Sequence, residues 1–265
     1  MSSAPLPFPA PPDAFWERAR RAACRLLAID YDGTIAPLCD RPEDAVPLPG
    51  MIDVLRPLSK SRRTQVAVVS GRPLEEVARL VPLPDLTFIG EHGWETRRPG
   101  GPLVREALPD EAAWALDRLD AALREESWAA AVERKRTALR LHTRMLSFAD
   151  GVNARHALRR LFRTHAHHGL ALEPVKGGME VRARGEDKGT ALRVLLGAMP
   201  PGTLPVYLGD DATDEDAFRA LGAEGVTIRV GDWGSPTAAL HRLSSPHDVL
   251  GFLQRWRDEL EGPAA

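Results

Sequence analysis

The sequence predicts an α/β fold in which a parallel β-sheet is covered by helices on both faces. Short apolar runs recur along the chain and end in a turn or in polar residues; they occupy 26–29, 66–69, 86–89 and 206–208. Stretches with helical spacing of apolar residues separate the runs, and this alternation is typical of parallel sheets. Because ligands of such sheets bind beyond the carboxyl ends of the strands, the residues that follow the runs are the first candidates for a functional site.

The two ends of the chain supply this sheet, and the middle has a different pattern. A helix at 110–131, an alternating stretch at 137–148, a helix at 152–168 and a short strand pattern at 170–181 predict an inserted α+β unit. Helices at 187–199, at 214–221 and near 247–260 then return to the α/β pattern. We place the core at 13–102 and 185–265 and the insertion at 103–184, with the Pro/Gly-rich 98–102 as entry linker. The five prolines of 1–12 predict a loose tail.

The composition of the chain limits the kinds of molecule that the protein is expected to bind. Lys and Arg number 35 against 37 Asp and Glu, so the chain lacks the basic excess that nucleic acid or anionic lipid attracts. It also lacks a secretory signal and an apolar run of membrane-spanning length. Two cysteines, Cys24 and Cys39, are too few for a disulfide framework and suit a reducing cytosol. We therefore expect a cytoplasmic, monomeric protein with a small-molecule substrate and with neither nucleic acid nor membrane as partner.

Two carboxylates follow the first apolar run. Asp30 stands directly after residues 26–29, Asp32 comes two residues later, and Gly33 allows a tight turn of the backbone. A divalent cation would offset their repulsion and screen an incoming phosphate, so that one carboxylate could attack phosphorus and the other act as acid and base. The same residues also fit an ordinary Asx turn that closes a strand.

The last apolar run is followed by five acids in the seven positions 210–216. The dipole of the next helix accounts for Asp214 and Glu215. Asp210 and Asp211 come before that helix, at the strand exit, where oxygen ligands of a hard cation are expected. A solvated acidic helix start is the alternative.

Two further positions predict an anion site. Lys188 lies at the start of a helix, where its charge opposes the helix dipole unless an anion is held nearby. Ser70 and Gly71 end the second run and could cradle a phosphate with a hydroxyl and backbone N–H groups. A surface lysine and a plain helix cap are the competing interpretations.

Taken in order, these motifs resemble those of the haloacid dehalogenase superfamily of phosphotransferases. The sequence reads strand-DxDGT, strand-SGR, a Lys at a helix start, and strand-GDDxTDED. The resemblance implies a Rossmann-like core with Asp30 as nucleophile, Asp32 as acid and base, and Ser70 with Lys188 on the phosphoryl group. It also implies Mg²⁺ held by Asp30, Asp32, Asp210 and Asp211, and substrate contacts from Gly33, Thr34, Gly71 and Arg72.

A finer resemblance, to trehalose-6-phosphate phosphatases, rests on residues 30–37, 70–73, 90–93, 176–182 and 209–218. It implies that the insertion is a cap of the C2 type that closes over a sugar. Implied sugar contacts are Glu91, His92 and Gly93 on the core and Arg144, Lys176, Glu180 and Arg182 on the cap. Each could instead be a surface charge. The stretch 141–144 departs from the His-Tyr-Arg pattern of the family, which puts Arg144 most in doubt.

We therefore predict a Mg²⁺-dependent phosphatase that converts trehalose 6-phosphate to trehalose and phosphate. Two alternatives stay open: a phosphatase for a related compound such as glucosylglycerol phosphate or mannosylglycerate phosphate, and a non-catalytic module that binds a sugar phosphate. His165, His167 and His168 lack a partner ligand at metal spacing and are expected to mark an exposed helix end instead.

Overall fold

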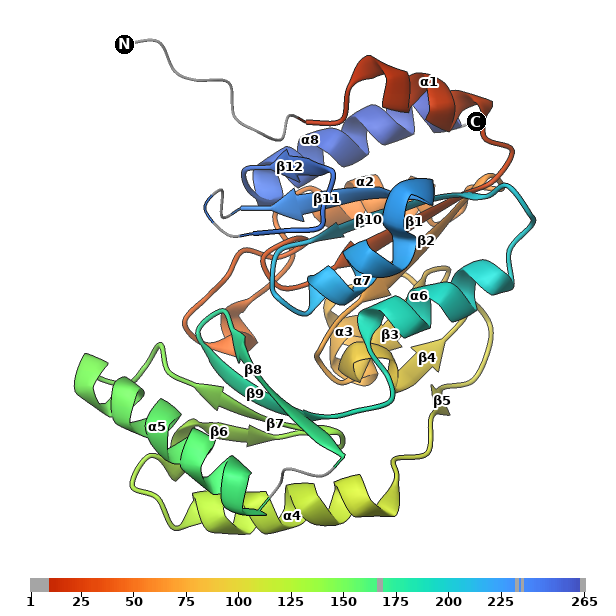
Figure 1. Ribbon diagram of the computed structural model, residues 1–265. Helices are drawn as coiled ribbons and strands as arrows, with labels where there is room; N and C mark the ends of the chain where they lie inside the picture. Colours follow the sequence, from red (N-terminus) through yellow and green to blue (C-terminus); the bar gives the residue numbers. More distant parts are fainter. Residues whose placement is uncertain (1–9, 166–168, 232–233, 235, 263–265) are drawn as a thin grey trace, which may run out of the picture.

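The computed structural model describes residues 10–165, 169–231, 234 and 236–262. Among them the principal element is an eight-stranded sheet, the large sheet, with the strand order β12-β11-β10-β1-β2-β3-β4-β5 (Figure 1). Its parallel strands are β12 (His241–Leu243), β11 (Val226–Val230), β10 (Leu204–Gly209), β1 (Arg25–Asp30), β2 (Thr64–Val69) and β3 (Thr87–Gly90). Two antiparallel strands, β4 (Glu95–Arg97) and β5 (Val104–Arg105), complete one edge.

Helices cover both faces of the large sheet because its central strands are buried on both sides. In β1, Leu27 and Ile29 point to one face and Leu26 and Ala28 to the other, as the two-residue period of a strand requires. The first face packs against α1 (Asp13–Arg21), α2 (Met51–Leu58), α3 (Leu74–Leu80) and α8 (Pro246–Trp256). The second packs against α6 (Lys188–Gly197) and α7 (Asp214–Leu221). The predicted fold class is confirmed.

A second, small sheet lies below the large one in Figure 1. Within the described residues it has four antiparallel strands in the order β6 (Val132–Arg134), β7 (Ala138–His142), β9 (Gly178–Ala183) and β8 (Leu170–Val175). Its apolar side chains, such as Leu139 and Val181, pack against α4 (Asp110–Arg124) and α5 (Phe148–His165). Strand alternation therefore places the intervening polar residues of β7 and β9 on the opposite face of the small sheet, away from these two helices.

Several element boundaries differ from the prediction. The helix from residue 110 ends at Arg124 rather than at 131, because the chain turns there and enters β6. The pattern at 170–181 forms two strands, which turn at Gly177 with a φ of 81° that suits glycine. Residues 98–102 join β4 to β5 within the large sheet, so the chain leaves that sheet only after Arg105. The proposed domain borders stay predictions.

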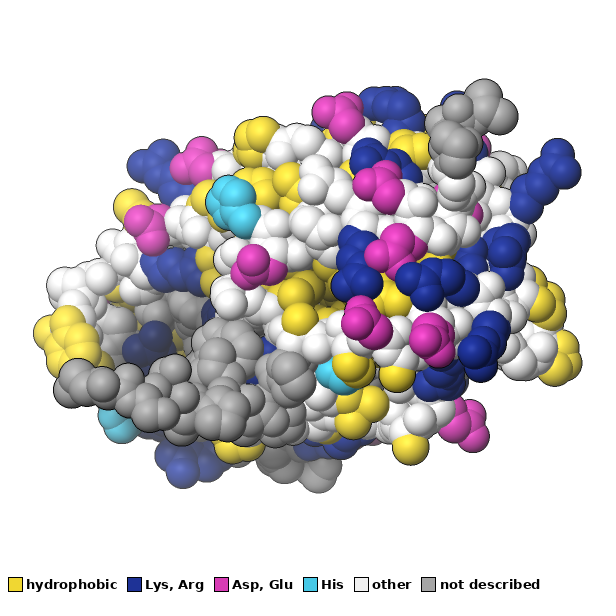
Figure 2. All heavy atoms as spheres, turned by 90° about the horizontal axis from the view of Figure 1, so that it is seen from above, with side chains coloured by type: hydrophobic (Ala, Val, Ile, Leu, Met, Phe, Trp, Pro, Cys, Tyr) yellow, Lys and Arg dark blue, Asp and Glu magenta, His cyan; other side chains and the backbone are white. Residues whose placement is uncertain are grey.

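His165 ends α5, whereas His167 and His168 lie outside the described residues, as do residues 1–9 of the predicted tail. Among the described helices, none combines the length and apolar character needed to cross a bilayer. On the face over α1 and α8, Lys and Arg side chains lie among Asp and Glu side chains (Figure 2), as in the contact of Arg255 with Asp13 and Glu259.

Candidate active site

A pocket opens between the carboxyl edge of the large sheet and the polar face of the small sheet. Three strands of the large sheet end beside it: β1 at Asp30, β2 at Val69 and β10 at Gly209. Its lining includes residues that follow these ends, namely Asp30, Asp32, Gly71, Arg72, Asp210 and Asp211. The pocket is thus where the strand topology predicts a ligand site.

Lys188 holds the centre of this site together. Its Nζ donates to Asp30 Oδ1 at 2.6 Å and to Asp214 Oδ1 at 2.7 Å, and all three side chains are buried. Although burial would lower the pKa of Lys188, the carboxylates of Asp214 and Asp30 raise it above its usual range. Asp187 positions the lysine by capping α6 through the backbone N–H of Thr190. The lysine is therefore a fixed cation beside the carboxylate of Asp30.

Asp214 is a structural part of the site that the helix dipole alone does not explain. Its carboxylate accepts hydrogen bonds from Tyr207 Oη at 2.6 Å and from the N–H groups of Asp210 and Asp211 at 2.9 Å each. Burial would raise the pKa of Asp214, but Lys188 and these hydrogen bonds hold it below its usual value. It stays ionised and orients both Lys188 and the loop after β10.

Three buried carboxylates form a candidate cation site. Ligand oxygens of Asp30, Asp210 and Asp214 all lie within 4.8 Å of one another among the described residues. Burial, and then the Asp214 charge, raise the pKa of Asp30 well above its ordinary value. Burial raises the pKa of Asp210 to about 7, against the opposing effect of Lys176. Clustered oxygen donors with so little solvent fit a hard divalent cation.

Gly33, which has no side chain, allows the carboxylate of Asp210 to approach the loop after β1. A Cβ atom at this position would lie 1.9 Å from Asp210 Oδ2, and the φ of 81° is one that side chains rarely adopt. Thr34, buried beside it, donates to Asp30 Oδ2 at 3.3 Å. Gly71 is constrained by close contact alone, because a Cβ there would lie 2.5 Å from His92 Cε1.

The other two acids predicted to bind the metal lie outside that cluster. Asp32 contacts Arg72 with both carboxylate oxygens, at 2.7 and 2.8 Å. Asp211 accepts the backbone N–H of Lys176 at 3.0 Å. Ser70 is also not free in the pocket: it is 1% exposed and its Oγ accepts the N–H of Arg72 at 3.1 Å. The structure thus places Asp214, rather than Asp32 or Asp211, with Asp30 and Asp210.

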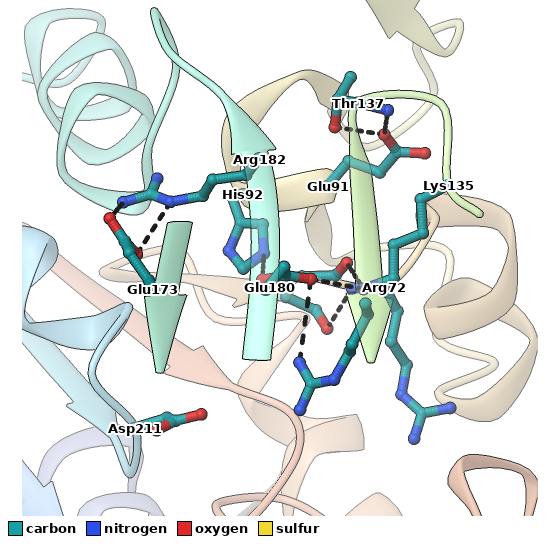
Figure 3. A network of polar contacts seen from close by, with 12 residues as sticks. Arg72, Glu91, His92, Lys135, Thr137, Glu173, Glu180, Arg182 and Asp211 are labelled. Carbon is teal, nitrogen blue, oxygen red and sulfur yellow. Dashed lines mark hydrogen bonds and ion pairs between the residues drawn. The ribbon is translucent and has the colours of Figure 1, made fainter. Parts of the chain in front are cut away.

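The predicted sugar-binding motif of the core is engaged by the small sheet. Glu91 accepts the N–H group of Thr137 at 2.8 Å and its hydroxyl at 2.5 Å (Figure 3). It also accepts the N–H group of Arg136 at 3.2 Å. Glu91 and His92 adopt φ values of 43° and 60° without being glycine. Such strained backbone is kept only where surrounding contacts demand it. Gly93 packs behind them, where a Cβ would lie 3.0 Å from the carbonyl oxygen of Asp187.

Glu180 connects the two sheets. It is fully buried, its Oε2 lies 2.9 Å from His92 Nε2, and its Oε1 accepts from Lys135 Nζ at 3.0 Å (Figure 3). Lys135 Nζ also donates to the carbonyl oxygen of Gly71 at 2.9 Å. Although burial opposes it, Lys135 and then His92 hold the pKa of Glu180 well below its usual range. The predicted sugar contact is therefore part of a buried hydrogen-bond network that joins the two sheets through His92 and the carbonyl oxygen of Gly71.

The remaining predicted cap residues divide into two groups. Lys176 and Arg144 line the pocket; Lys176 Nζ donates to Asp210 Oδ2 at 2.7 Å, and Arg144 donates to the carbonyl oxygen of Cys39. Arg182 lies outside the lining and pairs with Glu173 and with Asp216 of α7, at 3.0 and 2.9 Å. Each of the three residues nevertheless contacts a group outside the small sheet: Asp210, the carbonyl oxygen of Cys39 or Asp216.

The pocket lining also contains residues that the motifs did not identify: Glu133, Lys135, Arg140 and His142. Positions 133 and 135, and positions 140 and 142, are two residues apart on or next to β6 and β7, so they share one face. His142 Nε2 lies 2.8 Å from Glu133 Oε2. The alternation of polar and apolar residues at 138–142 was the signal that could have identified this face.

Asp30 and Asp210 lie at the ends of parallel strands and Lys188 at the start of α6, as the predicted resemblance to haloacid dehalogenase phosphotransferases implies. A family model described as Trehalose-phosphatase matches residues 28–246. The chain belongs to this family of phosphatases.

Relatives and solved structures agree with this membership. The chain is 34% identical over 243 residues to a trehalose-phosphate phosphatase of Mycobacterium marinum, and the match covers 88% of this chain and 61% of the relative. It is 37% identical over 251 residues to an uncharacterized glycosyl hydrolase of Mycobacterium tuberculosis, of which it spans only 18%. The chain thus corresponds to part of each of these longer proteins.

Among solved structures, the C-terminal domain of Candida albicans trehalose-6-phosphate phosphatase superposes with a TM-score of 0.83 at 24% identity, covering 94% of this chain and 98% of that one. At that identity the likeness concerns the fold. A trehalose-6-phosphate phosphatase of Aspergillus fumigatus gives a TM-score of 0.66 at 29% identity, with 93% and 97% covered.

Proposed function

We propose that the protein hydrolyses trehalose 6-phosphate to trehalose and phosphate in the pocket between the two sheets. The observation that carries the proposal is the buried cluster of Asp30, Lys188, Asp210 and Asp214 at the strand ends, which faces the polar side of the small sheet. A nucleophile beside a fixed cation suits phosphoryl transfer, and membership of the family supports the choice of substrate.

The reaction that suits these residues has two steps. First, a carboxylate oxygen of Asp30 attacks phosphorus, the bond from phosphorus to the sugar oxygen breaks, and Asp32 gives its proton to that oxygen. Next, the Asp32 carboxylate takes a proton from water, the water oxygen attacks the same phosphorus, and the bond to Asp30 breaks. Phosphate leaves, and both side chains return to their starting states. Lys188 stabilises the negative charge on the transferred group in both steps.

We propose Mg²⁺ as the cofactor, held by oxygens of Asp30 and Asp210 with Asp214 behind them. The all-oxygen donor set supports a hard cation. When bound, such a cation keeps these buried carboxylates ionised and screens the charge of the phosphate group. Asp32 and Asp211 remain proposed ligands. Arg72 and Lys176 already contact both carboxylate oxygens of these two residues, so Asp32 would bind the cation through its backbone carbonyl oxygen and Asp211 through a lone pair that Lys176 leaves free.

The polar face of the small sheet would bind the sugar. Glu133, Arg140, His142 and Lys176 line the pocket with charged donors and acceptors of the kind that hydroxyl groups require. We propose that these residues contact the disaccharide, and that Glu91, Glu180 and Arg182 hold the small sheet in place. The two free cysteines, Cys24 and Cys39, support a location in the reducing cytosol.

The test is phosphate release with Mg²⁺, with and without EDTA, from trehalose 6-phosphate, glucose 6-phosphate, sucrose 6-phosphate and glucosylglycerol phosphate. We expect trehalose 6-phosphate to be hydrolysed at least about 10-fold faster than the others, in kcat/KM, and only with metal. A faster reaction of another compound would leave the chemistry in place and refute the substrate. Hydrolysis of none would favour a non-catalytic sugar-phosphate-binding module.

A further inference from the structure

We propose that Arg72 is a positioning residue that holds the carboxylate of Asp32 for proton transfer, and that it does not bind the substrate phosphate. The inference rests on the proposed function, in which Asp32 is the acid and base of both steps. It assigns Arg72 a role different from the substrate contact that its motif implies.

The contacts of the guanidinium carry the inference. Nε and Nη2 of Arg72 donate to the two oxygens of Asp32, at 2.8 and 2.7 Å, in the bidentate geometry that fixes the plane of a carboxylate. Nη2 also donates to the carbonyl oxygen of Pro42 at 2.8 Å, and Nη1 donates to Glu76 of α3. Four of the five N–H groups of the guanidinium thus have partners among the described residues.

The aromatic ring of Tyr31 also restricts the guanidinium of Arg72. Arg72 is 7% exposed, and its Cζ lies 5.4 Å from the centre of the Tyr31 ring. Tyr31 is itself buried and donates from its hydroxyl to the carbonyl oxygen of Ala45 at 2.7 Å. A side chain held by a ring, a carbonyl group and two carboxylates cannot turn toward a phosphate without losing several of these contacts.

Asp32, by contrast, keeps access to the pocket. Its side chain is 35% exposed and belongs to the pocket lining. Each of its oxygens uses one lone pair for Arg72 and retains another for a proton, since a carboxylate has about four acceptor positions. Arg72 therefore limits the rotation of Asp32 while leaving it able to exchange a proton with the sugar oxygen and then with water. The contribution of Arg72 to turnover is expected to pass entirely through Asp32.

The experiment compares Arg72→Met, Asp32→Asn and the double variant on two substrates. Trehalose 6-phosphate has a poor leaving group that needs a proton, whereas p-nitrophenyl phosphate has a good leaving group that does not. We expect Arg72→Met to lower kcat for trehalose 6-phosphate about 100-fold with KM changed less than about 3-fold, as for loss of acid–base catalysis. In the Asp32→Asn background the same change should cost less than about 2-fold.

p-Nitrophenyl phosphate separates the two chemical steps. Without a positioned base, Asp30 is still phosphorylated but water is activated slowly. Arg72→Met should therefore release one equivalent of nitrophenolate in a burst, followed by a slow steady state. A purely structural role would slow both steps and give no burst. Arg79→Met, which removes an exposed arginine from the helix that follows Arg72, α3, controls for the loss of a positive charge.

Three results would overturn the proposal: a KM raised about 10-fold with kcat retained, full additivity with Asp32→Asn, or the absence of a burst. If wild-type protein does not hydrolyse trehalose 6-phosphate, the proposed substrate fails, and the burst with p-nitrophenyl phosphate still decides the role of Arg72. If Arg72→Met does not fold, as judged by circular dichroism, Arg72→Lys undergoes the same comparisons, because a lysine keeps the charge and loses the bidentate contact.

Discussion

Lys188 shows how a residue that is unfavourable for its own helix can be favourable for the site. A cation in the first turn of α6 opposes the helix dipole, and the sequence predicted that an anion would compensate. The structure supplies two anions, the carboxylates of Asp30 and Asp214. A phosphoryl group entering beside Asp30 would meet a cation that is already in place and needs no rearrangement.

At the same scale, Asp30→Asn should abolish turnover of both trehalose 6-phosphate and p-nitrophenyl phosphate, by at least about 1,000-fold, because the amide cannot form the covalent intermediate. The fold should persist, since the amide oxygen can still accept from Lys188. Initial rates of phosphate release, together with circular dichroism, measure both expectations. Asp53→Asn, on the exposed side of α2, is the matched control. Turnover by pure Asp30→Asn protein would refute the nucleophile.

At the scale of elements, β9 carries both the packing and the charge of the small sheet. Met179 and Val181 face α4 and α5, while Glu180 between them faces His92 of the large-sheet unit. The buried Glu180 carboxylate stays ionised because Lys135 and His92 compensate its loss of hydration, in spite of burial. One strand thus fixes the core of the small sheet and its attachment to the pocket.

Glu180→Gln should therefore destabilise the protein by about 3 kcal/mol at pH 7, because it leaves Lys135 without its carboxylate partner. The pKa of Glu180 is lowered on folding from its ordinary value of 4.5, so its contribution is present above pH 4.5 and is lost as the pH falls through the folded value. The difference between variant and wild type should shrink below pH 4.5.

Urea unfolding of both proteins at a series of pH values measures this difference. Glu125→Gln, at an exposed position after α4, is the control and should change stability by less than about 0.5 kcal/mol. A difference that is constant with pH would mean that Glu180 is not ionised in the folded protein.

The sequence predicted the central strands that form continuous apolar runs, and it missed β11 and the shortest strands. The runs that became β1, β2, β3 and β10 are buried on both faces, which makes them continuous and apolar. Strands of two or three residues, such as β5 and β12, are too short for a period to be recognised. Local propensity gives little information on them, because their pairing depends on a neighbour that is already formed.

Part of the candidate site could likewise be predicted from the sequence, and part could not. Motifs placed Asp30, Asp210 and Lys188 correctly at strand and helix ends, since position along an element follows from the sequence. The partners of Glu91 and Arg72 could not be predicted, because Thr137 and Asp32 reach them only after the chain has folded. Spacing identifies the face on which a residue lies, and tertiary contacts decide what that residue touches.

At the scale of the molecule, the two sheets form one pocket only while the contacts between them hold. Glu91, whose backbone is strained, makes several of these contacts from the side of the large sheet. Its carboxylate accepts hydrogen bonds from two N–H groups and one hydroxyl of residues 136–137. These residues form the turn between β6 and β7, which also carries Lys135 into the pocket. Loosening this one turn should move an entire wall of the sugar-binding face.

Thr137→Val should loosen the turn without unfolding either sheet, because it removes the hydroxyl contact with Glu91 and keeps both N–H contacts. A hydrogen bond to a charged group contributes about 1.5 to 3 kcal/mol. We expect faster amide hydrogen exchange at residues 134–138 and a KM for trehalose 6-phosphate raised about 3-fold or more, with p-nitrophenyl phosphate hydrolysis changed less than about 2-fold. Thr164→Val, on the exposed side of α5, should change neither quantity. Equal exchange at residues 134–138 in wild type and Thr137→Val would show that the Thr137 hydroxyl does not hold the two sheets together, and the pocket would then depend on the other contacts between them, such as those of Glu180 and Lys176.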